Sequence, residues 1–224
     1  MSRTRVKICG IARLEDAQCA IKAGADALGF VFVKESPRYI SPETASSIIL
    51  QLPPLVTIVG LFMDNDAEDV ESILSQVRLD LLQFHGDETP AFCERWACRY
   101  IKSIPMGDSV SNVSDLGTKL DPLSYSSRYT SSIGFLLDSN ALGESGGSGK
   151  IFDWKRVPKN LNKAIIVAGG LAPENVKQAV TEIKPYGVDV SSGVESLKGI
   201  KDHQKIIAFI NAVNEGNQAN AINS

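Results

Sequence analysis

A cysteine and an aspartate stand at matching places in this sequence, each directly after a short apolar run. Cys9 closes the alternating stretch Val6-Lys7-Ile8 and is followed by Gly10, as at a strand that turns sharply into a helix. Asp138 closes Phe135-Leu136-Leu137. A carboxyl group there is partly desolvated, which favours its protonated form and suits it to donate a proton. The alternatives are a small buried cysteine and a turn-forming aspartate.

Two turns rich in glycine and serine near the end of the chain could bind an anion. Gly169-Gly170 follows one apolar run, and Ser191-Ser192-Gly193 follows another that contains Asp189. Glycines let backbone N–H groups approach a phosphate without a Cβ in the way, and serine hydroxyls add further donors. We also expect Val194 and Glu195 to open a short helix whose N-terminus would favour negative charge. The sequence therefore predicts a phosphate site, the alternative being two ordinary glycine turns.

Three other stretches carry weaker signals. Arg38 lies in the rigid loop Ser36-Pro37-Arg38-Tyr39-Ile40, from which its planar fork could hold a carboxylate, although a surface arginine is the alternative. His85 is either a ligand contact or a histidine satisfied within its own turn. The run Gly146-Gly147-Ser148-Gly149-Lys150 fails the nucleotide P-loop pattern on both flanks. It is a lid, a further phosphate contact or a plain connection.

Strand-like and helix-like segments alternate along the 224 residues and would position all of these groups. The strand segments are short, branched and apolar on both sides, as buried parallel strands require. We predict one closed (β/α)₈ TIM barrel with its phosphate site after strands seven and eight, and an open doubly wound sheet is the alternative. The carboxyl ends of all strands would surround a single cavity. The predicted strands are residues 6–9, 26–32, 56–62, 81–84, 100–104, 133–137, 164–168 and 187–190.

Two parts of the chain fit the barrel pattern less well. Residues 105–132 are rich in serine, and Val113, Leu116 and Leu120 form only a faint helical stripe. Residues 1–214 are predicted to form the barrel, and residues 215–224 a frayed polar tail.

Composition argues against several classes of function. A net charge of -3 does not provide the clustered basic excess of a nucleic-acid surface. No apolar run approaches the roughly 18 residues that span a membrane. Four cysteines show no CxxC pair and only two histidines are present, which disfavours structural zinc. Free thiols and a start that leads directly into a strand, with no room for a signal peptide, favour a cytoplasmic location.

Eight short motifs, in this order and at matching spacing, resemble the phosphoribosylanthranilate isomerase family of tryptophan biosynthesis. The resemblance extends from the first predicted strand to the last predicted helix and is weakest in residues 105–132. The motifs are Val6-Lys7-Ile8-Cys9-Gly10-Ile11, Gly24-Ala25-Asp26-Ala27-Leu28-Gly29-Phe30, Ser36-Pro37-Arg38-Tyr39-Ile40, Gln83-Phe84-His85-Gly86, Leu136-Leu137-Asp138, Gly146-Gly147-Ser148-Gly149, Ala168-Gly169-Gly170-Leu171 and Asp189-Val190-Ser191-Ser192-Gly193-Val194-Glu195.

The resemblance implies a (β/α)₈ barrel without cofactor or metal that acts on a small phosphosugar–anthranilate substrate. It implies conversion of N-(5-phosphoribosyl)anthranilate to 1-(2-carboxyphenylamino)-1-deoxyribulose 5-phosphate by an Amadori rearrangement. Nucleic acid and membrane are not implied as partners, and the expected state is a monomer or a homodimer.

The resemblance also implies residue roles. Cys9 is expected to be the general base and Asp138 the general acid, while Arg38 meets the anthranilate carboxylate. Gly169, Gly170 and the Ser191, Ser192 and Gly193 loop are expected to hold the ribose phosphate. His85 and Asp189 are expected at further substrate-facing positions.

A thiol acts as a base only in its thiolate form, so a neighbouring cation would help. We expect Lys7 to point to the opposite face of the strand from Cys9, which would make it a poor candidate to lower the thiol pKa.

Two other functions are alternatives to this one. The first is a histidine-pathway aldose–ketose isomerase on the same barrel. Its chemistry resembles a reaction carried out by two aspartates, and the cysteine at the end of the first predicted strand, Cys9, argues against it. A non-catalytic sensor of a phosphorylated ligand would need the phosphate site but not Cys9 together with Asp138.

Overall fold

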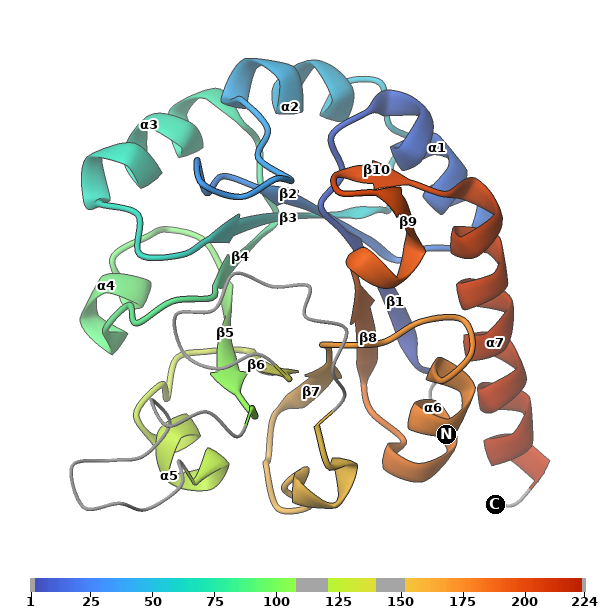
Figure 1. Ribbon diagram of the computed structural model, residues 1–224. Coiled ribbons are helices and arrows are strands. Elements are labelled where there is room, and N and C mark those ends of the chain that lie inside the picture. The colour runs from blue at the N-terminus through green and yellow to red at the C-terminus, as the bar shows by residue number, and fades with distance from the viewer. Residues whose placement is uncertain (1–2, 108–120, 140–151, 223–224) are drawn as a thin grey trace.

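The computed structural model describes residues 3–107, 121–139 and 152–222, and their strands form one closed parallel barrel. The strands follow each other around the barrel in chain order, and β8 pairs with β1 to close it. The helices surround this ring of strands (Figure 1). The predicted (β/α)₈ barrel is therefore confirmed. Its strands are β1 (Arg5–Cys9), β2 (Ala27–Val31), β3 (Thr57–Phe62), β4 (Leu81–Phe84), β5 (Tyr100–Pro105), β6 (Gly134–Asp138), β7 (Ala164–Val167) and β8 (Gly187–Val190).

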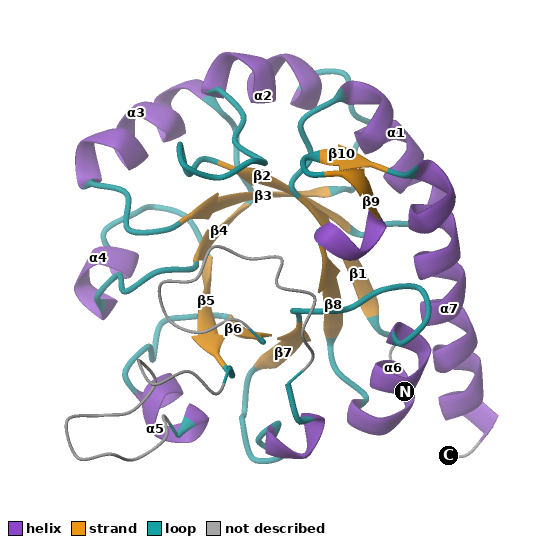
Figure 2. Ribbon diagram, in the orientation of Figure 1, coloured by secondary structure: helices purple, strands orange, loops and turns teal. Residues whose placement is uncertain are grey.

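Helices connect most of the strands, and a small hairpin is added after the last one (Figure 2). The α-helices are α1 (Leu14–Ala23), α2 (Pro42–Ile49), α3 (Ala67–Gln76), α4 (Pro90–Glu94), α5 (Pro122–Ser127), α6 (Val176–Ile183) and α7 (His203–Ile222). The 3₁₀ helices are η2 (Trp154–Arg156) and η3 (Ser192–Val194), and the hairpin strands are β9 (Glu195–Leu197) and β10 (Ile200–Lys201).

Local sequence sets several helix starts. Ser41 Oγ accepts a hydrogen bond from the backbone N–H of Thr44 at 3.2 Å, and Thr89 Oγ1 accepts one from Phe92 at 3.3 Å. Each cap is followed by a proline at the first helical position, where a missing N–H costs nothing. These caps help to end the loops after β2 and β4, so α2 and α4 begin at defined residues.

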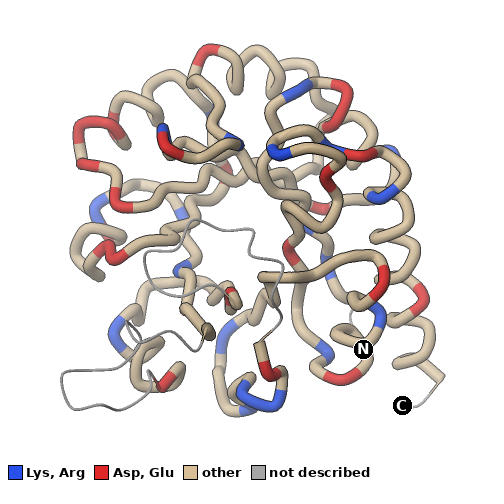
Figure 3. The backbone as a smooth tube through the Cα atoms, viewed as in Figure 1, with Lys and Arg blue, Asp and Glu red and all other residues tan. Residues whose placement is uncertain are grey.

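Side chains alternate along each strand between two cores. One set faces the helices and forms the large apolar core, which includes Phe30, Leu82 and Phe135. The other set faces the barrel interior, where a small cluster contains Ile101, Leu136 and Ala168. In the view of Figure 3, acidic and basic positions are interspersed around the outer ring of helices. Among the described helices, none combines the length and apolar character that crossing a membrane requires.

The weakly patterned segment 105–132 is described only in part. It contains α5, whose start is capped by Asp121 through a 2.8 Å hydrogen bond from Ser124 N to Oδ2. The faint stripe of Val113, Leu116 and Leu120 lies outside the described residues, as does the glycine run 146–150.

The predicted fraying of residues 215–224 is wrong as far as residue 222, because α7 continues to Ile222. Its polar residues contact neighbouring elements instead of solvent alone. Asn217 Oδ1 accepts a 2.9 Å hydrogen bond from the backbone N–H of Thr4, and Asn220 Nδ2 donates to the carbonyl of Val180 at 3.0 Å. Apolar periodicity does not detect such polar contacts, so the sequence underestimated the helix.

The helix expected at Val194 and Glu195 is also wrong. The three-residue η3 ends at Val194, and Glu195 is the first residue of β9, which pairs in antiparallel fashion with β10. The extended backbone of Glu195 lets its carboxylate turn toward charged partners at the barrel mouth.

Neighbouring isoleucines on α7 test the apolar layer outside the barrel. Ile206 is fully buried, whereas the side chain of Ile207 is 46% exposed. Ile206→Ala should lower the free energy of unfolding by about 2–5 kcal/mol, because it removes buried methyl groups and leaves a cavity. Ile207→Ala should change it by less than about 0.5 kcal/mol. Urea denaturation followed by circular dichroism measures both, and equal losses would contradict the packing described.

Candidate active site

A cavity of about 340 Å³ lies at the carboxyl ends of the strands. Its volume is within the range of small-molecule sites. Loops and strand ends from widely separated parts of the chain form its wall. Of the residues predicted for the site, those that line it are Cys9, Arg38, His85, Asp138, Gly169, Gly170, Asp189, Ser191 and Ser192.

The loops after β7 and β8 form one side of this cavity. Gly169 and Gly170 have φ angles of 75° and 63°, a backbone region that other residues rarely adopt. Gly193, by contrast, does not line the cavity. A Cβ at Gly193 would overlap the carbonyl oxygen of Leu171, so this glycine lets the two loops pack together. The serine hydroxyls and the glycine turn are thereby held at one side of the cavity.

Cys9 and Lys7 lie side by side inside the barrel. A Cβ on Gly29 of the adjacent strand would lie 2.7 Å from Cys9 Sγ and 3.1 Å from Lys7 Cε, so both side chains pass over this glycine. The expectation that Lys7 points away from Cys9 is therefore wrong. Residues two apart on a strand share a face, and the expectation placed them on opposite faces.

Lys7 is held by an ion pair across the seam that closes the barrel. Its Nζ donates to Asp189 Oδ1 at 2.8 Å, and the two residues are register partners on β1 and β8. Both are buried. Asp189 therefore lines the cavity and also neutralises the lysine beside Cys9.

Opposing influences set the acidity of Cys9, whose side chain is buried. Burial raises the pKa of the thiol, whereas the charge of Lys7 lowers it, Asp189 raises it and Lys201 lowers it. The net effect is a raised pKa. At neutral pH the sulfur of the free protein is a thiol, and the two lysines favour the thiolate when it forms.

Asp138 has a histidine beside it. His85 Nε2 lies 3.4 Å from Asp138 Oδ2, and His85 Nδ1 lies 3.1 Å from Gln83 Nε2. Burial lowers the pKa of His85, and Asp138 opposes this only in part, so the ring is neutral near pH 7. In the tautomer that accepts from Gln83 at Nδ1, the ring carries its proton on Nε2, facing the carboxylate. His85 thus contacts Asp138 as well as the cavity.

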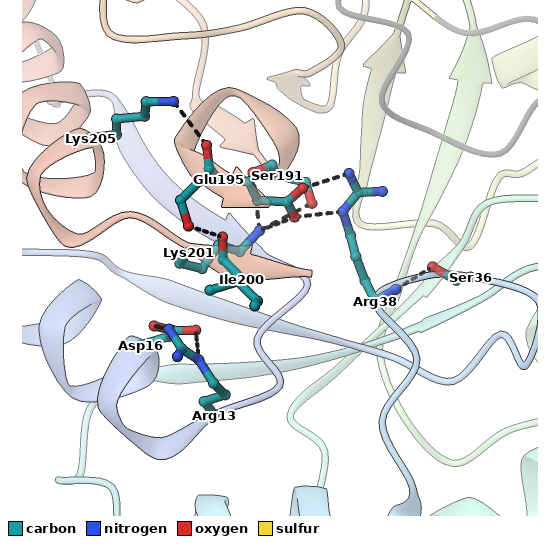
Figure 4. Close-up of polar contacts among 10 residues, drawn as sticks. Arg13, Asp16, Ser36, Arg38, Ser191, Glu195, Ile200, Lys201 and Lys205 are labelled. Atoms are coloured by element: carbon teal, nitrogen blue, oxygen red, sulfur yellow. Dashed lines mark hydrogen bonds and ion pairs between the residues drawn. The ribbon is translucent and has the colours of Figure 1, made fainter. Parts of the chain in front are cut away.

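Arg38 is held by a carboxylate of the protein itself (Figure 4). Its Nε and Nη2 donate to Glu195 Oε1 and Oε2 at 2.8 and 3.0 Å, the two-bond geometry that the sequence expected for a substrate carboxylate. Lys201 Nζ lies 3.0 Å from Glu195 Oε1 and also donates to the carbonyl of Ser191 at 3.0 Å.

Sequence reasoning missed several charged or polar residues of this site. Lys7 could have been found from its spacing of two from Cys9, and Gln83 from the same spacing before His85. Lys201 had no comparable signal, because a two-stranded hairpin after the last barrel strand brings it to the site. Among the described residues, no three His, Cys, Asp or Glu side chains gather as metal ligands would.

The site combines a thiol, a carboxyl group and two turns rich in glycine and serine around one small cavity. The family model described as N-(5'phosphoribosyl)anthranilate (PRA) isomerase matches residues 6–212. Proteins named N-(5'-phosphoribosyl)anthranilate isomerase are similar over nearly the whole chain. The one from Pseudomonas fluorescens (strain Pf0-1) is 52% identical, covering 95% of this chain and 100% of its own. That from Nitrosococcus oceani is 49% identical, covering 96% and 100%.

Solved structures agree with these sequence matches. Phosphoribosyl anthranilate isomerase from Thermotoga maritima has a TM-score of 0.81 and 39% identity, covering 94% of this chain and 98% of that one. A phosphoribosyl anthranilate isomerase in complex with reduced 1-(o-carboxyphenylamino)-1-deoxyribulose 5-phosphate has a TM-score of 0.75 and 38% identity, with the same coverage.

Removing the charge of Lys7 and removing that of Asp189 should have opposite effects on the pKa of the Cys9 thiol. Lys7→Met should raise the pKa of Cys9 and slow its alkylation at neutral pH by roughly tenfold, because the rate follows the thiolate fraction. Asp189→Asn should lower this pKa and speed alkylation. Iodoacetamide labelling, followed by mass spectrometry of the Cys9 peptide, gives both rates. Lys34→Met, which removes an exposed lysine paired with Asp69, is the control and should have no effect.

Proposed function

Because this chain belongs to the N-(5'-phosphoribosyl)anthranilate isomerase family, we propose that it converts N-(5-phosphoribosyl)anthranilate to 1-(2-carboxyphenylamino)-1-deoxyribulose 5-phosphate. It is an isomerase of tryptophan biosynthesis, and the reaction is an Amadori rearrangement. One observation supports the assignment of this reaction to this site. Cys9 and Asp138 line one cavity together with the glycine and serine loops after β7 and β8.

Asp138 is the general acid in this proposal. It protonates the ring oxygen of the sugar while the C1–O bond breaks and the nitrogen lone pair forms an imine at C1. Its place at the end of β6, buried and lining the cavity beside His85, supports this role, because a general acid must lie within reach of the atom that it protonates.

Cys9 is the general base. Its thiolate removes the proton from C2, and the electrons of that C–H bond form the C1–C2 double bond of an enolamine. The enolamine then gains a proton at C1 and loses the proton of its C2 hydroxyl group, which gives the ketone at C2. C2 is oxidised and C1 is reduced within the same molecule, so the electrons balance. The acid and the base are each expected to contribute about 10²–10⁴-fold to the rate.

The other residues of the cavity bind the substrate. The ribose phosphate is held at the side of the cavity formed by the loops after β7 and β8. Its donors are the backbone of Gly169 and Gly170 and the hydroxyls of Ser191 and Ser192. Gly193 supports this loop by its packing on Leu171. Arg38 faces the anthranilate carboxylate, and His85 and Asp189 contact the sugar portion.

We place the enzyme in the cytoplasm, which is supported by the four cysteines, all of them free thiols. A monomer or a homodimer remains the expected state. The isomerase from Thermotoga maritima is described as dimeric.

Removing either proposed catalytic group should abolish turnover without unfolding the protein. Cys9→Ala and Asp138→Ala should each lower kcat by at least about 10²–10⁴-fold, because each removes one proton-transfer step. The fluorescence of phosphoribosylanthranilate, followed as it disappears, measures the rate, and circular dichroism checks the fold.

Cys19→Ala provides the matched control, because Cys19 lies on α1, outside the cavity. It should retain full activity. Full activity in Cys9→Ala or Asp138→Ala would remove the role of that residue. Ligand binding by the wild-type protein without any turnover would indicate a sensor instead of an enzyme.

A negative charge in the loop after β8 should weaken substrate binding. Ser192→Asp should raise KM by about tenfold or more, because a carboxylate would repel the phosphate at close range. Ser196→Asp adds the same charge on β9, where the side chain is exposed, and should leave KM within about twofold. Equal effects of the two substitutions would argue against phosphate binding beside Ser192.

A further inference from the structure

The buried charges behind the phosphate side of the cavity form one connected cluster, Arg38, Glu195 and Lys201 (Figure 4). Their exposed fractions are 8%, 8% and 3%. Arg38 comes from the loop before α2, Glu195 from β9 and Lys201 from β10. Arg38 is distant in sequence from the other two, and it meets them because the hairpin of β9 and β10 lies at the barrel mouth (Figure 1).

Lys201 has the contacts of a complete ammonium group. Its Nζ donates to the carbonyl of Ser191 at 3.0 Å, to Ser191 Oγ at 3.3 Å and to Glu195 Oε1 at 3.0 Å. An ammonium group has three N–H donors, and each of them has an acceptor here. Lys201 is therefore bound as a cation, in contact with the same serine that lines the cavity.

Two cations of the cluster contact one carboxylate, because Glu195 accepts from both Arg38 and Lys201. By comparison, Lys7 and Asp189 on the other side of Cys9 form a one-to-one pair. Lys201 also places a positive charge beside Ser191, which lines the cavity, and such a charge attracts an anion.

We propose that Glu195 and Lys201 are positioning residues for the isomerase reaction, with Glu195 orienting Arg38 and Lys201 supplying a positive charge that attracts an anionic substrate. This inference rests on the proposed function. Neither residue needs to touch the substrate, because Arg38 and Ser191 transmit their effect. The cluster links the carboxylate-binding and phosphate-binding parts of the site through one buried carboxylate.

Two neighbouring lysines offer a matched comparison. Lys201 contacts the carboxylate of Glu195, whereas Lys205 Nζ donates to its backbone carbonyl at 2.9 Å. Lys201→Met should raise KM for phosphoribosylanthranilate and weaken competitive inhibition by inorganic phosphate, each by about tenfold or more, because an attractive charge near the bound anion is lost. The decrease in kcat should be smaller. Lys205→Met should leave both constants within about twofold.

The pH profile separates a charge effect from mere loosening of the fold. Cys9 is faced by Lys7 of β1, Asp189 of β8 and Lys201 of β10, and the charge of Lys201 lowers its pKa. Lys201→Met should therefore shift the rise of kcat/KM to higher pH, whereas Lys205→Met should not. Thermal unfolding of each variant checks the fold. If Lys201→Met does not fold, Lys201→Gln, which can still donate to Ser191, replaces it.

Glu195→Gln tests orientation apart from charge. It leaves both cations in place, so a purely electrostatic role would strengthen anion binding. Because Arg38 loses its two-bond partner, we expect KM to rise by about tenfold instead. Equal kinetics in the Lys201 and Lys205 variants, or an unchanged or lower KM in Glu195→Gln, would overturn the inference while wild-type turnover stands. Absence of turnover in the wild type would refute the proposed function itself.

Discussion

The ion pair between Lys7 and Asp189 joins the first and last barrel strands from the inside. Both side chains are buried, and their 2.8 Å contact lies at the seam where β8 meets β1. Burying either charge alone would be strongly unfavourable, so each requires the other. The same pair sets the electrostatic surroundings of Cys9. One contact therefore reinforces the backbone pairing that closes the barrel and also acts on the sulfur of Cys9.

Other buried ion pairs hold the loops at the mouth of the barrel. The network of Arg38, Glu195 and Lys201 fixes the hairpin against the loop before α2. On the opposite side, Lys102 Nζ donates to the carbonyl of Gly86 at 2.5 Å and lies 3.3 Å from Glu88 Oε2. Lys102 thus restrains the loop after β4 that carries His85. Buried charged side chains of the hairpin strands and of β5 therefore hold the neighbouring loops in defined positions.

The sequence predicted the parts of the fold that depend on local patterns. Alternation of apolar residues located the strands within a few residues, and serine or threonine followed by proline located the starts of α2 and α4. Once a barrel was inferred, the positions of Cys9 and Asp138 at strand ends were enough to place both at one cavity. That step needed only topology, because parallel strands present their carboxyl ends to the same side.

The parts that the sequence did not predict depend on tertiary contacts. Glu195 was expected in a helix, but it lies on a strand and its carboxylate contacts Arg38 and Lys201. Arg38 is distant in the sequence, and Lys201 belongs to a hairpin that has no clear sequence pattern. The end of α7 looked frayed because its stabilising contacts are polar. The face of Lys7 was assigned wrongly although the information was present, since its spacing from Cys9 was sufficient to place it.

The raised pKa of Cys9 has a consequence for the durability of the protein. Peroxides react with thiolates much faster than with thiols, and the first product is a sulfenic acid. A sulfur that is buried and protonated at rest offers oxidants little to attack. The burial that raises the pKa of the Cys9 thiol therefore also slows its oxidation by peroxides.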